Sequence, residues 1–175
     1  MKSIHTILYI VTLAFLFSGC KKELDINDNP NQAVVPPMNG LLASTTYFTA
    51  YNVYRVGNTT SYFVQYLASP NANGASDTYE ATSYTTTWQK LYDNMTDIHD
   101  LIEQARAAGA TQHLGAAEVM MAINLEMLND LWNSVPYTQA FNTSILQPGY
   151  TPGDSILQQC IGLLNDAVVQ LNDAS

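Results

Sequence analysis

Few side chains in this 175-residue sequence are suited to covalent chemistry, since it holds only two cysteines and three histidines. The signatures HExxH, GxSxG and CxxC and the phosphate-binding loop, which mark common catalytic and nucleotide sites, do not occur. Gly153-Asp154-Ser155 matches the core triplet of one group of lipases and esterases, in which the serine is the nucleophile. That chemistry needs a histidine base near the C-terminus, and no histidine follows His113. We therefore expect a protein that is not an enzyme and that needs no metal or other cofactor.

Cys20 is the residue for which the sequence predicts a covalent modification. Lys2 gives a positive start, an apolar run covers Ile7–Phe17, and small residues precede the cysteine in Phe17-Ser18-Gly19-Cys20. At about 1.5 Å rise per residue, this run is too short to span a hydrocarbon core of roughly 30 Å. The last four residues resemble a bacterial lipobox, with Phe17 where leucine is usual. We expect residues 1–19 to be a signal peptide and the sulfur of Cys20 to carry lipid; an ordinary signal peptide with a coincidental cysteine is the alternative.

Residues 20–37 follow the predicted cleavage site and are polar and punctuated by prolines. This composition is typical of a tether or an extended segment, here carrying the lipid at its start. The other cysteine, Cys160, then has no partner for a disulfide within the chain. Because it lies between Leu157 and Leu164 on an apolar helix face, we interpret it as a small buried hydrophobe rather than a nucleophile.

Aromatic and amide side chains indicate a binding surface. Eleven Tyr and two Trp accompany many Asn, Gln, Ser and Thr residues, and aromatic faces cover the apolar side of a sugar ring while amides bond its hydroxyls. The segment 69–80 is a loop by composition and leads into an aromatic helix start. The candidate ligand contacts in this region are Asn71, Asn73, Asp77, Tyr79, Tyr84 and Trp88. For Trp88 and Trp132 the sequence favours packing in the core over ligand contact, because both lie on apolar helical stripes.

Composition limits the possible partners and the number of domains. The formal net charge is −9 and only six residues are Lys or Arg, so no nucleic acid is expected as a partner. With 47% hydrophobic residues the chain has enough apolar surface for a core, and one domain is the natural expectation.

Two strong helical patterns lie in the middle of the chain. The first is a heptad stripe of Tyr84, Trp88, Leu91, Met95, Ile98, Ile102 and Ala105, and Gly109 ends it. The second, from Leu114 to Trp132, is apolar over most of its circumference, which predicts a central position, and Pro136 prevents its continuation. The short turn between the two patterns predicts an antiparallel pair.

The flanking segments have weaker patterns. Between Met38 and Ala68 the spacing favours two short helices, the second closed by Pro70, although a strand pairing stays open because Thr and Tyr are frequent. A last helix opens with Thr151 as N-cap, Pro152 at the first helical position and Asp154 reaching back to the cap. Its broad apolar stripe comprises Ile156, Leu157, Cys160, Ile161, Leu164, Ala167, Val168 and Leu171. No later helix is available to cover that stripe, so we expect a truncated chain or the first part of a larger domain.

Several of these segments together resemble the SusD/RagB group of Bacteroidetes outer-membrane lipoproteins, and most closely its SusD-like branch. They are the lipobox, the opening Leu24-Asp25-Ile26-Asn27 with Asn29-Pro30-Asn31, the turn Leu131-Trp132-x-x-Val135-Pro136-Tyr137-x-x-Ala140-Phe141, and the helix from Thr151 to Leu171. Relatives usually have Gly and an acid where this chain has Asn133 and Ser134. The resemblance implies an all-α fold of irregular, tetratricopeptide-like antiparallel helix pairs. Residues 38–175 would be the N-terminal part of such a domain, which is incomplete here.

The resemblance also implies a function. Such proteins are surface-exposed and held in the outer membrane by their lipid. They capture an oligosaccharide or another nutrient and hand it to a SusC-like TonB-dependent transporter. Two alternatives stay open: a helical scaffold that binds only protein, and a surface glycoside hydrolase. The enzyme would need two carboxylates facing one cleft, whereas Asp97, Asp100 and Glu103 are typical of a solvated helix face.

Overall fold

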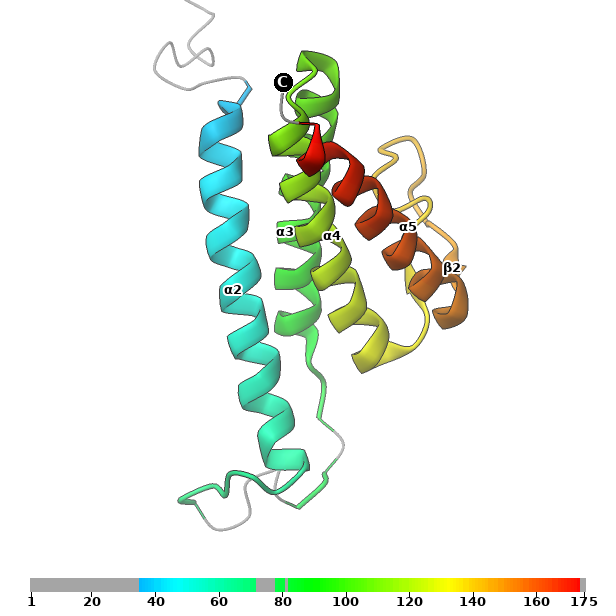
Figure 1. Ribbon diagram of the computed structural model, residues 1–175. Helices are drawn as coiled ribbons and strands as arrows, with labels where there is room; N and C mark the ends of the chain where they lie inside the picture. Colours follow the sequence, from blue (N-terminus) through cyan, green and yellow to red (C-terminus); the bar gives the residue numbers. More distant parts are fainter. Residues whose placement is uncertain (1–34, 72–77, 81, 174–175) are drawn as a thin grey trace, which may run out of the picture. The chain divides into compact units, whose positions relative to one another are not determined.

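The computed structural model describes residues 35–71, 78–80 and 82–173, and residues 36–175 form one compact unit. The predicted signal peptide, the lipidation site at Cys20 and nearly all of the predicted tether lie outside the described residues, as do Asn73 and Asp77. The described elements, in chain order, are α2 (Met38–Phe63), α3 (Thr85–Ala108), α4 (Thr111–Trp132), β1 (Val135–Pro136), β2 (Tyr150–Thr151) and α5 (Gly153–Asn172). Within this part of the chain, regular structure is therefore almost wholly helical, and the predicted all-α fold of antiparallel helix pairs is confirmed (Figure 1).

Helix α4 is the central element, as its apolar circumference predicts. It packs against α2, α3 and α5, which surround it in Figure 1. Ala117, Leu125 and Leu128 are fully buried, and the facing side chains of α3 at Leu91 and Ile98 are equally inaccessible. A helix that buries side chains on several sides needs apolar residues on several sides, which explains the sequence of α4.

The antiparallel turn between α3 and α4 forms at Gly109, as predicted. Its φ of 64° is in the left-handed region, where glycine has no steric penalty. The Gly109 N–H donates to the carbonyl of Arg106, and the Ala110 N–H donates to that of Ala105. These bonds satisfy two carbonyls that the end of α3 leaves without helical partners.

Helix α2 corrects the prediction of two short helices, because Met38–Phe63 is one continuous helix of 26 residues. Its buried side chains, spaced by four, four and three residues, are Leu41, Thr45, Thr49 and Asn52. Three of these four are polar, so a search for apolar periodicity does not detect the buried face. Threonine hydroxyls inside the helix bond to earlier carbonyls, as Thr45 Oγ1 does to Leu41 O at 2.7 Å.

A buried polar network joins α2, α3 and α4. Asn124 of α4 is its centre: its Nδ2 donates to Thr49 Oγ1 at 2.9 Å and to Met120 O at 2.8 Å. Its Oδ1 accepts from Nδ2 of Asn52 at 3.2 Å and of Asn94 at 3.3 Å. Buried amides need such partners, and these bonds form only when the three helices keep one register.

The start of α5 also differs from the prediction. Thr151 does not cap the helix; it is buried in an antiparallel bridge with Val135, and Pro136 pairs with Tyr150. The helix begins at Gly153, and its N-cap residue Pro152 makes no side-chain cap bond. The Asp154 carboxylate instead accepts from the Ser155 N–H at 2.7 Å. The two-stranded pairing engages Thr151 as extended backbone, and this moves the helix start beyond the predicted cap.

Helix α5 packs one side on α4 and leaves the other open. Ile156, Cys160 and Ala167 are buried, whereas Ile161 and Val168 are 52% and 59% exposed. The buried position of Cys160 agrees with its interpretation as a small hydrophobe, and burial raises the pKa of its thiol to about 11. None of the helices in the described ranges combines the length and apolarity needed to cross a membrane.

Candidate ligand-binding site

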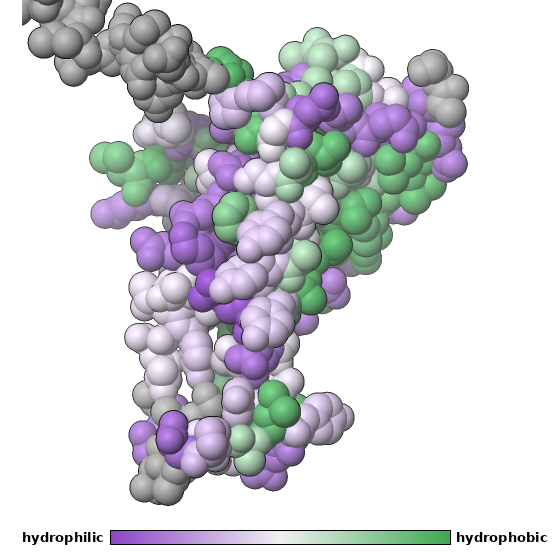
Figure 2. All heavy atoms as spheres, turned by 90° about the vertical axis from the view of Figure 1, so that its left-hand side faces the viewer, coloured by the Kyte–Doolittle hydropathy of each residue, from purple (hydrophilic) through white to green (hydrophobic). Residues whose placement is uncertain are grey.

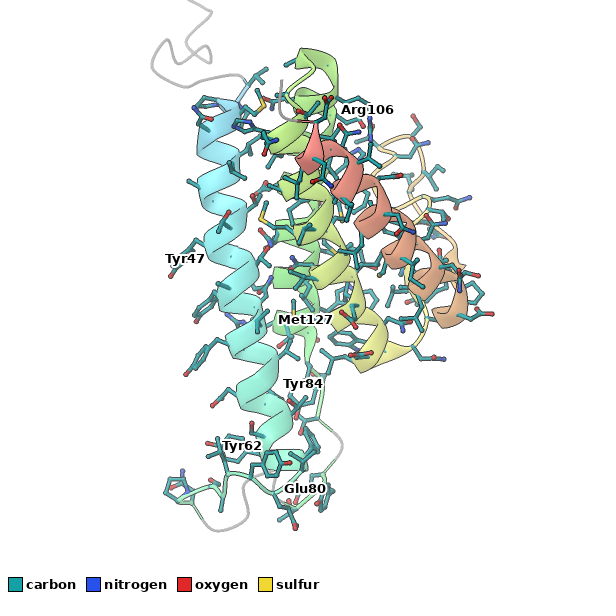
Figure 3. All side chains as sticks on the ribbon, viewed as in Figure 1. Tyr47, Tyr62, Glu80, Tyr84, Arg106 and Met127 are labelled. Carbon is teal, nitrogen blue, oxygen red and sulfur yellow. The ribbon has the colours of Figure 1, made fainter. Side chains whose placement is uncertain are left out.

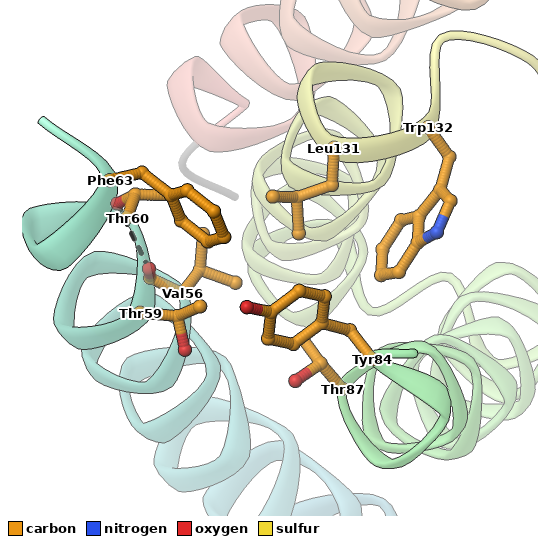
Figure 4. A pocket seen from close by; sticks show the side chains of 8 residues that line it. All are labelled: Val56, Thr59, Thr60, Phe63, Tyr84, Thr87, Leu131 and Trp132. Atoms are coloured by element: carbon orange, nitrogen blue, oxygen red, sulfur yellow. Dashed lines mark hydrogen bonds between the residues drawn. The ribbon is translucent and has the colours of Figure 1, made fainter. Parts of the chain in front are cut away.

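An apolar cavity of 220 Å³ lies where α2 ends, α3 begins and α4 ends (Figure 4). We call it the aromatic cleft, and its lining residues are Val56, Thr59, Thr60, Phe63, Tyr84, Thr87, Leu131 and Trp132. In Figure 3, Tyr84 lies between the last turns of α2 and the first turn of α3. Helix ends position these side chains, so the packing of α2, α3 and α4 fixes the cleft.

A second hollow, of 450 Å³, adjoins the cleft and shares Tyr84 and Trp132 with it. Its other lining residues are Thr82, Ser83, Thr85, Trp88 and Tyr150. Two edge-to-face ring pairs lie in this region: Trp88 meets Trp132 at 5.0 Å between centroids, and Phe63 meets Tyr84 at 6.1 Å. Edge-to-face packing favours fixed orientations of these rings, which line the two hollows.

The residues lining the two hollows include no Asp, Glu, His, Lys or Arg. The walls are aromatic and aliphatic, with threonine, serine and tyrosine hydroxyls among them. This combination suits a neutral ligand that has both an apolar face and hydroxyl groups, as a sugar ring has. It supplies no pair of carboxylates for hydrolysis of a glycosidic bond.

The predicted contact residues have different positions. Tyr84 and Trp88 come together at the second hollow, and Tyr79 approaches the cleft through Phe63, with ring centroids 6.2 Å apart. Asn71 is exposed and lines neither hollow. The position of Trp88 is compatible with both core packing and ligand contact, since its ring packs on Tyr92 at 4.9 Å between centroids and also lines the second hollow.

Sequence reasoning missed three of the aromatic lining residues as ligand contacts. The sequence pattern predicts a separate short helix around Phe63, favours core packing for Trp132, and leaves Tyr150 in the connection before α5. The turn motif that contains Trp132 was the available signal, because it carries aromatic residues on both sides of Pro136. Tyr150 comes to the site through its pairing with Pro136, which the sequence pattern does not reveal.

The outer face of α2 carries a separate row of aromatic side chains. Tyr47, Tyr51 and Tyr54 are 63%, 41% and 65% exposed, and the rings of Tyr47 and Tyr51 are nearly parallel at an interplanar angle of 5°. The guanidinium of Arg55 lies 5.1 Å from the centre of the Tyr51 ring, within the range of a cation–π contact. Figure 2 looks onto this face, where weakly hydrophilic side chains lie among strongly hydrophilic and apolar ones. We call these three residues the α2 tyrosine row.

The acidic residues considered for hydrolysis lie on α3, away from the aromatic cleft. Asp100 and Glu103 are exposed, in agreement with a solvated face, whereas Asp97 is half-buried. Burial raises the pKa of the Asp97 carboxyl, and Asp100 and Asp93 add to that shift. Across the described residues, no three His, Cys, Asp or Glu side chains are grouped closely enough to hold a metal ion.

Comparison with known proteins agrees with this architecture. A crystal structure of a SusD/RagB family protein from Bacteroides thetaiotaomicron is similar, with a TM-score of 0.68 and 22% sequence identity. The likeness covers 77% of this chain and 30% of that protein, and at this identity it supports the fold alone. No protein of curated function matches the chain. A family model, SusD-like and described as "Starch-binding associating with outer membrane", matches residues 30–175. Because the match spans most of the chain, this protein belongs to the SusD-like family.

Proposed function

We propose that this chain belongs to a surface-exposed outer-membrane lipoprotein that binds an oligosaccharide or a similar nutrient and hands it to a SusC-like TonB-dependent transporter. The observation that carries the proposal is the pair of hollows that share Tyr84 and Trp132. Their aromatic walls and hydroxyl groups match the chemistry of a sugar, and the family description refers to starch binding at the outer membrane.

In this proposal the protein binds its ligand without breaking a bond. A sugar ring stacks its apolar face on Tyr84 or Trp132, and neighbouring hydroxyls such as that of Thr59 exchange hydrogen bonds with it. The lining lacks the acid and base that a glycosidase uses, so bound oligosaccharide leaves unchanged. Release to a transporter requires that the affinity for the ligand is moderate.

Calorimetric titration tests the ligand class. The protein with Cys20→Ser is titrated with maltoheptaose, with other oligosaccharides and with peptides. We expect at least one oligosaccharide to bind, and Tyr84→Ala or Tyr150→Ala to weaken it about tenfold, because a buried aromatic contact contributes roughly 1–2 kcal/mol. Tyr54→Ala is the matched control, since Tyr54 is exposed on α2 and lines neither hollow. Affinity equal to that of the parent protein in both the Tyr84 and the Tyr150 variants would exclude the two hollows as the binding site.

The membrane anchor is tested separately. In cells fed with labelled palmitate, the natural chain should incorporate label and the Cys20→Ser chain should not. Label in the variant would refute Cys20 as the lipidation site. Protease treatment of intact cells then tests surface exposure, and co-purification with a SusC-like transporter from the same cells tests the proposed partner.

A protein-binding scaffold is the second candidate, and the exposed α2 tyrosine row favours it. Tyr is common where proteins meet, because its ring and its hydroxyl both make contacts. If no oligosaccharide or peptide binds in the titration and the protein still binds the transporter, the result would support the scaffold function and exclude nutrient binding.

A further inference from the structure

A separate cavity of 380 Å³ lies among α3, α4, α5 and the connection that follows β1. Arg106 and His99 of α3, Glu118 of α4, Tyr137 and Phe141 of the connection, and Gln159 of α5 are among its lining residues. It is distant from the aromatic cleft, because 12 residues of α3, about 18 Å of helix, separate Thr87 from His99. Figure 3 shows Tyr84 and Arg106 toward opposite ends of α3. We call this third space the Glu118 cavity.

Glu118 is the unusual feature of this cavity. Its side chain belongs to a residue only 4% exposed, and its Oε2 is buried with no hydrogen-bond partner among the described residues. A buried carboxylate without a partner is costly, so the group must either hold a proton or meet a positive group. Burial raises the pKa of Glu118, Asp166 of α5 raises it further, and Arg106 opposes the shift.

The two basic side chains that line the cavity, Arg106 and His99, are engaged by other groups. The guanidinium of Arg106 is engaged by Glu103, with Nη1 and Oε1 at 2.6 Å. The ring of His99 stacks on Phe141, with centroids 4.8 Å apart and an interplanar angle of 15°. Three carboxyl groups, of Glu103, Glu118 and Asp166, therefore act near the cavity against the single guanidinium of Arg106. The excess of negative charge favours a cationic guest.

We propose that the Glu118 cavity binds the protonated primary amine of a small ligand whose apolar body lies against Phe141 and Tyr137. An ammonium group has three N–H donors and no acceptor, so it can donate to the Glu118 carboxylate and also to the amide oxygen of Gln159. The volume of the cavity is within the range of small-molecule sites. This site does not depend on sugar binding at the aromatic cleft.

Benzylamine and benzyl alcohol are suitable probes, because they share the aromatic body and differ in the charged group. Calorimetry measures the binding of both probes to the chain with Cys20→Ser and to the same chain with Glu118→Gln added. The second change keeps the shape of the side chain and removes its charge. Glu126→Gln is the matched control: it also removes a carboxylate from α4, at an exposed position outside the cavity. We expect benzylamine to bind at least tenfold more tightly than benzyl alcohol, to lose at least tenfold in Glu118→Gln, and to be unaffected in Glu126→Gln.

Carbon-13 NMR of the Glu118 carboxyl gives a readout that needs no variant to fold. Saturating benzylamine should lower the pKa of Glu118, since a nearby ammonium stabilises the carboxylate, and benzyl alcohol should leave it unchanged. The proposal is overturned if benzylamine does not bind, if it binds Glu118→Gln equally well, or if the pKa of Glu118 does not respond. Any of these results would show that Glu118 does not bind the amine in this cavity.

Discussion

At the scale of single residues, Asn124 shows how polar side chains determine the packing of this mostly apolar core. It is fully buried, and its amide bonds to side chains from both α2 and α3. Apolar contacts alone tolerate sliding between helices, but these bonds have directions and are lost when a helix shifts by one residue. The network therefore selects one register for three helices.

We expect Asn124→Ala to lower the free energy of unfolding by about 2–3 kcal/mol. The change leaves Asn52 and Asn94 with fewer partners inside the core, and each unsatisfied buried group costs about 1–3 kcal/mol. Urea denaturation followed by circular dichroism measures the effect. Asn172→Ala is the matched control, because Asn172 is exposed and its amide donates to Val168 O of the same helix; that variant should lie within about 0.5 kcal/mol of the parent. Equal stability of the two variants would contradict a structural role for the network.

Cys160 gives a prediction about reactivity. Because its pKa is raised to about 11, its thiolate fraction at pH 8 is about one in a thousand, compared with about a quarter for a free cysteine. In a Cys20→Ser chain, where Cys160 is the remaining thiol, we expect a thiolate-specific reagent to react very slowly with the native protein and rapidly after urea is added. Fast labelling of the native protein would show that the thiol is accessible and ionised.

At the scale of elements, two glycines of α5 occupy opposite environments. A Cβ added to Gly153 would lie 2.8 Å from Oδ1 of both Asn129 and Asn133 and even closer to the backbone carbonyl of Asn133. A Cβ added to Gly162 meets nothing within 4 Å. Asn133 itself has a φ of 64°, a conformation that glycine adopts more easily. Its carbonyl is the backbone group that approaches Gly153.

Substitution by alanine should therefore have opposite effects at the two positions. Gly153→Ala should destabilise the protein by about 1–3 kcal/mol, because backbone at Asn133 has to move. Gly162→Ala should stabilise it by about 0.5–1 kcal/mol, the gain expected for replacing glycine inside a helix. Thermal unfolding of the two variants and the parent measures both changes in stability. A stabilised Gly153→Ala variant would mean that the turn from α4 to α5 is looser than described.

The sequence predicts α3 and α4 well because their buried faces are apolar and repeat with the helical period. It predicts α2 poorly because Thr45, Thr49 and Asn52 form most of its buried face. At the candidate site, Tyr84 and Trp88 are accessible to sequence reasoning because they open a helix after a polar loop. Phe63 and Tyr150 are not, because they reach the hollows through tertiary contacts. Periodicity reports which residues share a helix face and gives no information about which helix ends meet.

At the scale of the whole molecule, the outward face of α5 exposes apolar side chains that can bind another protein surface. Its apolar residues with more than two-fifths of their surface exposed are Leu157, Ile161, Leu164, Val168, Val169 and Leu171. Four of them, at 157, 161, 164 and 168, follow the helical period and form one stripe. Contiguous apolar surface of this kind drives association of proteins in water. A second copy of the same chain presents the same stripe and can cover it.

We expect the full chain with Cys20→Ser to self-associate with increasing concentration, and we expect Ile161→Lys combined with Val168→Lys to keep it monomeric. Both lysines would be exposed, so the free energy of unfolding should change by no more than about 0.5–1 kcal/mol. Sedimentation velocity over a series of concentrations measures the association. Ala167→Lys is the informative contrast: Ala167 is 1% exposed on the side that faces α4, so this variant should lose stability because it forces a charge into the core. A monomeric parent chain, or a double-lysine variant that associates as strongly as the parent, would show that the α5 stripe does not drive association.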